Sequence, residues 1–413
     1  MNTRLIAQTT LLLAMLAGAQ LASATAPADP PITIDTHVDI PFDYMGKPQF
    51  DVGKDTQLLV DLPKMERGGL NAAFFVIWVP QGPLTAKGYA KAVAEAEQKY
   101  EGIGRMLMTY PDRIRLATTP EQVMANHQAG LLSAMIGIEN SYSLGHDLHR
   151  LDAAYDRGAR YVGLVHVGNN DLCSSSVPGI KHGEPAMNSA GDTGMSEFGR
   201  AVVARANQLG MLVDVSHASD ACVRATLKVS KAPVIASHSG ARALIDHPRN
   251  LPDDLLRAIA AKGGVIQAVA YKEFLKVDPG REAAEKKLQQ KVAKDGGNKS
   301  YDSDRDDYTP AMAAGMALIQ KKYPLATVED YVDHIQHIAK IAGIDHVGIA
   351  SDFDGGGGIT GWADASQTRN VTAALRKRGF SDADIAKIWG GNLLRVWREV
   401  DRESVQERAH VAP

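Results

Sequence analysis

Eight short apolar runs recur along the chain and are separated by longer amphipathic stretches. Each run is nearly continuous in apolar residues and does not alternate with polar ones. This pattern is typical of strands that are covered on both faces, as in a parallel sheet. The predicted strands are residues 32–40, 71–79, 132–140, 159–167, 211–217, 232–239, 263–271 and 346–355.

The stretches between these runs have the apolar period of helices. Residues 84–107, 193–210 and 327–343 repeat apolar positions about every 3.6 residues, as helices packed on a sheet do. Eight strands alternating with helices predict an α/β fold, a (β/α)₈ TIM barrel. An open doubly wound sheet is the main alternative, but the sequence has neither its glycine fingerprint after the first strand nor a P-loop.

One connection is much longer than the others. Residues of about 275–325 are rich in charged residues, glycine, aspartate and serine, and they predict a solvent-exposed excursion with one short helix. Loops of this length are often lids over a site. We keep two hypotheses for it, a cover over the end of the barrel and a plain surface insertion.

Most of the predicted strands end in a side chain that can bind metal. His37 and Asp39 lie two residues apart on one strand and therefore point to the same face. Of the 13 histidines, four stand at strand ends, where the chemistry of such barrels collects. The pattern predicts a metal site built from His37, Asp39, Glu139, His166, His217, His238 and Asp352.

This set is too large for one tetrahedral zinc ion, whose catalytic form has three protein ligands. Two metals that share a carboxylate would use it fully, and such a pair activates water and polarises the group under attack. The chemistry also needs a base that is not committed to metal. Asp352 suits this role because its strand returns beside the first, and Asp354 is the alternative, unless it serves only the glycine-rich turn.

Composition excludes several partners. The chain has 413 residues and a formal charge of −3, with 45 basic and 48 acidic residues spread along it. No basic surface for nucleic acid or an anionic membrane is expected. Only Cys173 and Cys222 are present, and they either pair in an oxidising compartment or stay as two buried free thiols.

The first residues have the pattern of a secretory signal peptide. Arg4 precedes an apolar stretch, and small residues up to Ala24 form the cleavage pattern. We therefore expect residues 1–24 to be removed, residues 25–413 to form one domain, and the protein to be periplasmic or secreted. The apolar stretch is short of the roughly 20 residues of a membrane span, and no lipid-attachment cysteine follows it, so no stable membrane anchor is expected.

Seven motifs are more specific than the pattern of strand ends. In order they are IDTHVDIP, GIEN, LVHVGNND, DVSHAS, PVIASHSGARAL, HPRNLPDD and GIASDFDG, and the closing segment is WGGNLLRVW. Together they resemble the membrane dipeptidase (renal dipeptidase) family of zinc peptidases, peptidase family M19, across nearly the whole mature chain. The segment VIQAVAYKEFL resembles that family only loosely, and the long excursion departs from it.

The resemblance implies a binuclear zinc centre. His37, Asp39 and Glu139 would hold one ion, and Glu139, His217 and His238 the other, so that Glu139 bridges them. His166 would contact the substrate and stabilise the oxyanion, Arg249 would bind the substrate's terminal carboxylate, and Asp352 would shuttle the proton. Tyr271 is a further substrate-side candidate. A guanidinium fork also suits a carboxylate on general grounds, although an ordinary salt bridge is the alternative for Arg249.

The predicted function is a dipeptidase that cleaves small peptides with a metal-bridging hydroxide. One alternative keeps the metal centre but acts on another amide or on a pathway-specific peptide in the periplasm. The other is a metal-bound accessory protein without hydrolytic activity. A homodimer is expected only by analogy with the family.

Overall fold

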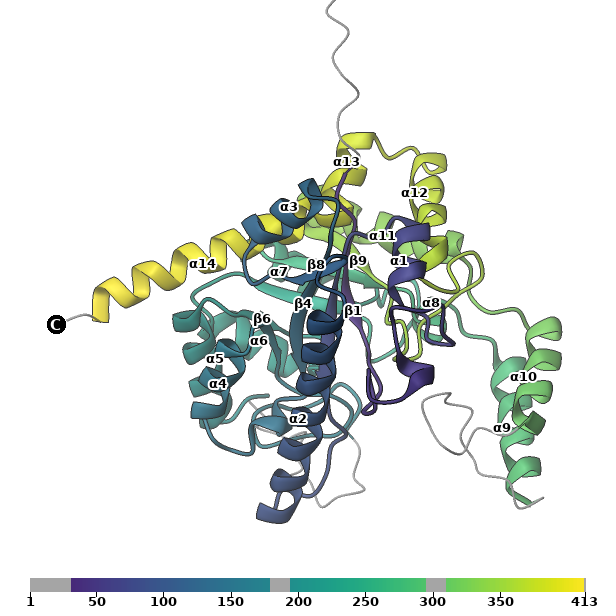
Figure 1. The fold of residues 1–413 in the computed structure, drawn as a ribbon, viewed down its shortest axis with the longest axis horizontal. Coiled ribbons are helices and arrows are strands. Elements are labelled where there is room, and N and C mark those ends of the chain that lie inside the picture. Colours follow the sequence, from purple (N-terminus) through teal and green to yellow (C-terminus); the bar gives the residue numbers. More distant parts are fainter. Residues whose placement is uncertain (1–30, 179–193, 295–309, 412–413) are drawn as a thin grey trace, which may run out of the picture. The chain divides into compact units, whose positions relative to one another are not determined.

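The computed structural model describes residues 31–178, 194–294 and 310–411. In this part of the chain, eight parallel strands form a nearly closed barrel (Figure 1). In ring order the strands are β1 (Ile34–Val38), β2 (Ala72–Trp78), β4 (Leu132–Glu139), β5 (Ala159–Gly163), β6 (Leu212–Asp214), β7 (Val234–Ser239), β8 (Val265–Val269) and β9 (Val347–Ala350). The eight predicted strands and the TIM-barrel class are confirmed.

The first and last strands meet just beyond their ends. The Asp39 amide donates to the Phe353 carbonyl at 2.9 Å, and the Asp352 amide donates to the His37 carbonyl at 3.1 Å. This contact closes the barrel and brings the two sequence ends of the site together. One strand that the sequence pattern missed, β3 (Ile114–Leu116), pairs with β4 outside the ring and is only three residues long.

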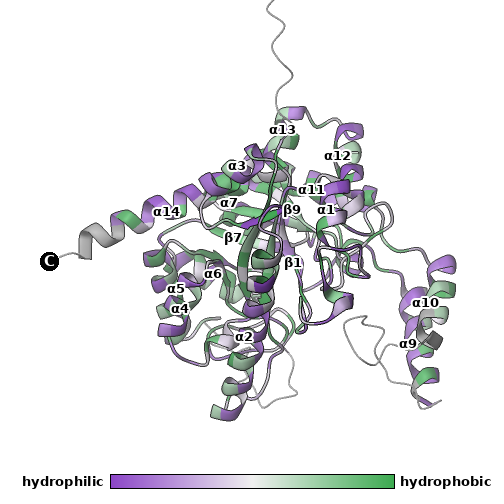
Figure 2. Ribbon diagram, viewed as in Figure 1, coloured by the Kyte–Doolittle hydropathy of each residue, from purple (hydrophilic) through white to green (hydrophobic). Residues whose placement is uncertain are grey.

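Helices cover the outside of the barrel, and along α2 and α14 apolar and polar residues alternate as expected for one buried face (Figure 2). Most start at a capping residue, as α5 does at Ser196, whose hydroxyl accepts from the Gly199 amide. The helices are α1 (Leu62–Gly68), α2 (Ala86–Thr109), α3 (Pro120–Gln128), α4 (His149–Asp156), α5 (Glu197–Leu209), α6 (Asp220–Val229), α7 (Asp253–Ala261), α11 (Val328–Ala342), α12 (Thr368–Lys377), α13 (Asp382–Ala386) and α14 (Asn392–Val411).

The core has two parts. One lies between the strands and the helices and includes Phe75 of β2 together with Ile103 of α2. The other contains the alternate strand residues, among them Phe74 and Tyr161, and Trp397 of α14 packs against them. Because side chains alternate along a strand, these residues point to the opposite face, the barrel interior. The interior is therefore filled with side chains, and the C-terminal helix contributes to it.

The long excursion contains more helix than expected. The short helix α8 (Lys272–Leu275) precedes it, and the excursion itself holds α9 (Pro279–Lys294) and α10 (Pro310–Lys322), which lie side by side (Figure 1). Arg281 of α9 binds the Gln320 side chain at 2.9 Å and the Tyr323 carbonyl at 2.6 Å. The expectation of a single short helix is wrong, because this charged segment contains two helices that hold each other through such contacts.

Two other predictions from the sequence concern the cysteines and the N-terminal segment. Cys173 and Cys222 form a disulfide with their Cα atoms 6.0 Å apart, so the alternative of two free thiols is wrong. The predicted signal peptide lies outside the described residues. Among the residues that are described, no helix is both long and apolar enough to cross a membrane.

Packing in the barrel leads to a first prediction. Gly137 of β4 lies beside Tyr161 of β5, and a Cβ at position 137 would stand 2.0 Å from a carbon of the Tyr161 ring. Because the ring is fully buried, we expect Gly137→Ala to lower the free energy of unfolding by about 1–3 kcal/mol. The control is Gly104→Ala on α2, where the Cβ meets nothing within 4 Å and should be neutral or stabilising. Chemical denaturation measures both, and equal stabilities would contradict this reading of the interior.

Candidate metal centre

The predicted metal and catalytic residues meet at the C-terminal end of the barrel. His37, Glu139 and His238 belong to β1, β4 and β7, and the others follow β1, β5, β6 and β9 within three residues. The structure brings all seven together in overlapping groups of three. In each group the candidate ligand atoms lie within 4.8 Å of one another. The seven residues are His37, Asp39, Glu139, His166, His217, His238 and Asp352.

Glu139 is at the centre of the group, and its two carboxylate oxygens face different partners. Oε2 lies 3.3 Å from Nε2 of His37. Oε1 lies 3.0 Å from Nε2 of His217 and 3.5 Å from Nε2 of His238. One carboxylate thus stands between two sets of donors, which is the arrangement that a bridging ligand needs.

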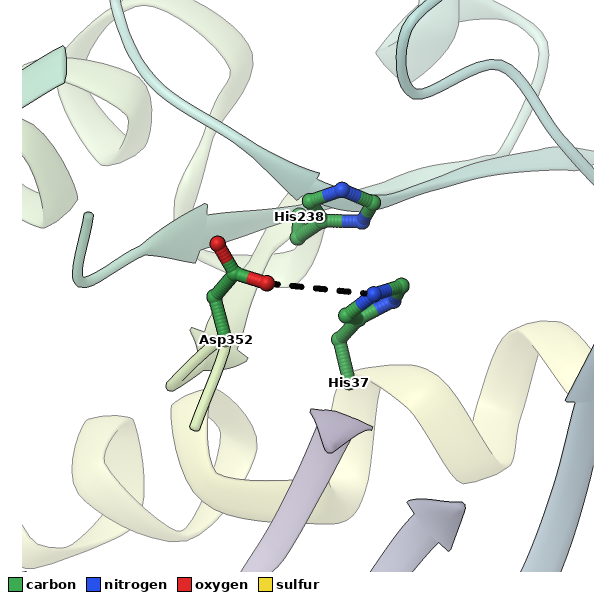
Figure 3. A group of neighbouring side chains, drawn as sticks. All are labelled: His37, His238 and Asp352. Carbon is green, nitrogen blue, oxygen red and sulfur yellow. Dashed lines mark ion pairs between the residues drawn. The ribbon is translucent and has the colours of Figure 1, made fainter. Parts of the chain in front are cut away.

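The His37 side of the centre also carries two more carboxylates. Nε2 of His37 lies 3.6 Å from Asp39 Oδ2 and 3.9 Å from Asp352 Oδ1. Figure 3 shows the imidazoles of His37 and His238 converging with the Asp352 carboxylate. Burial alone would lower the pKa of His37, but the charges of Glu139 and Asp39 raise it well above its usual value. The site is therefore a strongly negative environment that favours a cation.

The donors fit a divalent metal. Nε2 of His217 and Nε2 of His238 are 2.9 Å apart, and burial lowers the pKa of both well below the usual value, so both imidazoles are neutral. A neutral imidazole offers a lone pair to a metal. Nε2 of His37 is buried and makes no hydrogen bond with any described residue. Imidazole and carboxylate donors in this mixture suit zinc or a similar ion.

Polar residues behind two of the histidines orient their rings. The Tyr161 hydroxyl lies 3.1 Å from Nδ1 of His37, and the Ser237 hydroxyl lies 2.8 Å from Nδ1 of His238. Ser237 in turn donates to Asp214 at 2.7 Å. When Nδ1 carries the proton, Nε2 is left to bind metal, which is the usual work of such partners.

These partners were missed by the sequence analysis, which considered only the ends of the strands. The available signal was a polar residue inside an otherwise apolar run: Asp214 in MLVDVSH and the first serine, Ser237, in APVIASHS. Tyr161 gave no such signal, because an aromatic residue in a strand is ordinary packing.

His166 lies at the rim of the centre. Its Nε2 is 3.7 Å from Oε1 of Glu139, and its ring packs on those of His217 and Trp78, with centroids 4.1 and 5.5 Å away. Its side chain is 21% exposed, more than those of the other histidines of the centre. Burial of the ring lowers its pKa. A neutral imidazole in this position can donate one N–H to a bound molecule.

Arg249 places a buried positive charge beside the same centre. Its Nη2 donates to the His238 carbonyl at 3.0 Å, and its guanidinium lies 5.3 Å from the Phe274 ring centroid. Nε makes no hydrogen bond with the described residues. Burial lowers its pKa to about 10, although Glu139 and Asp352 raise it. Tyr271 stacks on Phe274 with ring centroids 4.3 Å apart, so this substrate-side candidate stands near Arg249.

The two candidate bases have different surroundings. Asp354 accepts hydrogen bonds from the amides of Leu59 and Val60 at 2.8 and 3.2 Å, so its carboxylate holds a loop in place. Asp352 instead faces His37, with Oδ1 3.9 Å from Nε2, although both aspartates have a left-handed backbone. Burial raises the pKa of Asp352 to about 8, with a further contribution from Asp39 and Glu139. The geometry favours Asp352 as the proton carrier.

A glycine permits this crowding of carboxylates. A Cβ at Gly355 would stand 2.2 Å from Oδ2 of Asp39 and 2.6 Å from Oδ1 of Asp352. Only a residue without a side chain lets the turn after β9 approach both groups. The glycine run in the sequence was the signal for this close approach.

Comparison with known proteins gives consistent results. A family model described as membrane dipeptidase (peptidase family M19) matches residues 24–411. The chain is 30% identical over 376 residues to the dipeptidase tcpJ of Claviceps purpurea, covering 89% of this chain and 75% of the relative. It is 31% identical over 348 residues to the dipeptidase aclJ of Aspergillus oryzae, covering 83% and 70% respectively.

A solved structure is also similar. The probable dipeptidase PvdM from Pseudomonas aeruginosa superimposes with a TM-score of 0.78 at 34% sequence identity, covering 90% of this chain and 96% of that one. The similarity therefore extends over most of the chain.

The raised pKa of Asp352 leads to a second prediction, for protein freed of metal by a chelator. Its pKa is 3.8 in an unfolded chain and about 8 in the fold, so the folded state holds this proton more tightly. The group therefore destabilises the fold increasingly as the pH rises from about 4 to about 8. Asp352→Asn should gain stability relative to the wild type across this window and level off above it. Denaturation at stepped pH measures the difference, and a difference independent of pH would contradict the assigned environment.

Proposed function

Since the chain belongs to the membrane dipeptidase family, peptidase family M19, it is a dipeptidase of the metallohydrolase class, and we propose that it works with two zinc ions. In this proposal His37, Asp39 and Glu139 hold one ion, and Glu139, His217 and His238 hold the other. The supporting observation is that the two oxygens of Glu139 face separate sets of imidazoles. When bound, such a pair of ions polarises the peptide carbonyl and lowers the pKa of the attacking water.

Arg249 is proposed to bind the terminal carboxylate of the substrate. A guanidinium fork pairs with a carboxylate through two parallel hydrogen bonds. The charge of Arg249 is buried beside the centre, where such a pair is strong. Because it lies next to Glu139 and Asp352, it would hold a carboxylate close to the bond under attack, which favours short peptides. Tyr271 would line the same side.

His166 and Asp352 are proposed to carry the chemistry of the chain itself. The neutral His166 imidazole donates a hydrogen bond to the oxyanion as the carbonyl carbon becomes tetrahedral, a contribution of typically a few kcal/mol. Asp352 takes a proton from the attacking water and passes it to the leaving amine. Its position suits this transfer, because the buried carboxylate faces His37 at the centre while that of Asp354 is committed to the amides of a loop.

We propose that the protein acts in the periplasm or outside the cell. The N-terminal pattern supports this, and so does the disulfide between Cys173 and Cys222, because such bonds persist in oxidising compartments. The homodimer stays a prediction.

A third prediction concerns metal and turnover together. We expect the purified mature protein to bind two zinc ions per chain and to cleave members of a panel of L,L and L,D dipeptides. Asp352→Asn should keep both ions and lose about 10²–10⁴-fold in kcat, because only proton transfer is removed. Elemental analysis and a ninhydrin or coupled amine assay measure the two quantities.

Each outcome of this experiment has a distinct meaning. Full activity of the Asp352→Asn variant would contradict its role. Two ions without cleavage of any dipeptide would contradict the dipeptidase assignment and favour a different amide substrate or an accessory function.

A fourth prediction tests Arg249 by removing the charge from either partner. The wild type should strongly prefer a dipeptide to the same dipeptide with an amidated C-terminus. Arg249→Gln should lose about 10²-fold in kcat/KM on the dipeptide, because breaking a buried charge pair costs 2 kcal/mol or more, and lose little on the amide. Arg113→Gln, a partly exposed residue paired with Glu66, is the matched control. An equal loss on both substrates would contradict carboxylate binding.

A further inference from the structure

The disulfide lies beside one half of the metal centre, and the geometry points to a role for it there. We propose that the Cys173–Cys222 disulfide is a positioning element that fixes the backbone of His166 and His217. In this way it sets the affinity for the cation held by Glu139, His217 and His238 more than for the cation held by His37 and Asp39. This inference rests on the two-cation centre of the proposed function.

The disulfide connects the segments that follow the two histidines. Cys173 comes seven residues after His166, and Cys222 comes five residues after His217, in the first turn of α6. Both cysteines are fully buried. A covalent bond at this place joins the two segments that follow β5 and β6 and carry His166 and His217.

The backbone at His217 needs such support. His217 has φ of 65°, in the left-handed region that residues with side chains rarely adopt. Such a conformation persists only where the surroundings hold it. Because the imidazole of His217 approaches Glu139 at 3.0 Å from this backbone, any relaxation of the backbone would withdraw the ring from the centre.

The support comes from the residues next to Cys173. The Ser176 amide donates to the His217 carbonyl at 2.8 Å, and Ser175 pairs with Ala218 in an antiparallel bridge. The Ser175 hydroxyl lies 2.5 Å from the His166 carbonyl and 3.5 Å from the His217 carbonyl. One serine thus contacts the backbone of both histidines.

Hydrogen bonds beside the disulfide also tie the segment that carries these serines to the start of α6. The Ser219 amide donates to the Ser174 carbonyl at 2.9 Å, and the Ser174 and Ser219 hydroxyls are 2.5 Å apart. Asn170 accepts from the Cys173 amide at 3.0 Å. These are single hydrogen bonds near the rim of the site, and the disulfide is the covalent bond that keeps their partners in register.

The other half of the centre has a different support. The backbone of His37 and Asp39 is held by hydrogen bonds to Asp352 and Phe353 at the junction of β1 and β9. Glu139 is held by the pairing of β4 with β2. Loss of the disulfide should therefore act unevenly on the two cations.

The test measures zinc affinity by competition with a chromogenic chelator, with no reference to turnover. The full mature chain carrying both Cys173→Ala and Cys222→Ala is compared with the wild type. We expect one zinc ion to bind as in the wild type and the second to bind about 10–100-fold more weakly, the range found when partners behind a metal ligand are removed. Ser175→Ala, which keeps the disulfide, should weaken the same ion by a smaller factor.

A stability control separates positioning from general loosening. Ile103→Ala on α2 truncates a buried side chain of the outer core and should lower stability while both zinc ions bind as in the wild type. If the double cysteine variant does not fold, the zinc affinities of Ser175→Ala alone decide between a selective and an equal weakening of the two ions.

The outcomes are separable from those of the proposed function. Wild-type affinity for both ions in the double variant and in Ser175→Ala would overturn the positioning role of the disulfide. An equal weakening of both ions would do the same. Neither result affects the proposed two-cation centre. A wild type that binds fewer than two zinc ions overturns the centre itself. A selective loss of affinity for one ion in both variants, but not in Ile103→Ala, supports the positioning role of the disulfide.

Discussion

The carboxylate of Glu139 is buried at the end of β4, and the residues around it must stabilise its negative charge. Burial raises the pKa of a carboxyl group, yet the neighbouring histidines bring the pKa of Glu139 well below its usual value. An ionised group in this position is stable only because imidazole nitrogens surround it. The same nitrogens are donors that a pair of divalent ions would require, so the groups that stabilise the charge of Glu139 are also the candidate metal ligands.

The barrel makes this arrangement possible by geometry. The eight strands end at one rim, and closure between β1 and β9 places residues from the two sequence ends of the barrel, His37 and Asp352, at 3.9 Å. Close approach has its own requirements: a glycine at 355 where any Cβ would touch two carboxylates, and a left-handed backbone at His217. The rigid strands carry His37, Glu139 and His238, while a loop next to serines and the disulfide carries His217.

Much of this was predictable from the sequence, and the failures have physical reasons. Apolar runs ending in metal-competent side chains gave the strands, the barrel and the positions of His37, Glu139 and His238, because strand ends are set by local pattern. The residues behind them, Tyr161 and Ser237, were missed because their role depends on which strands become neighbours. The two helices of the excursion were missed because a charged segment has little apolar periodicity from which to predict them.

The central claim is that Glu139 joins two cations. Anomalous diffraction from crystals of the zinc-loaded protein tests it most directly, since it locates each ion without reference to activity. The account predicts two peaks roughly 3.5–4 Å apart, one beside each oxygen of Glu139. A single peak, or two peaks that do not share this carboxylate, would contradict it.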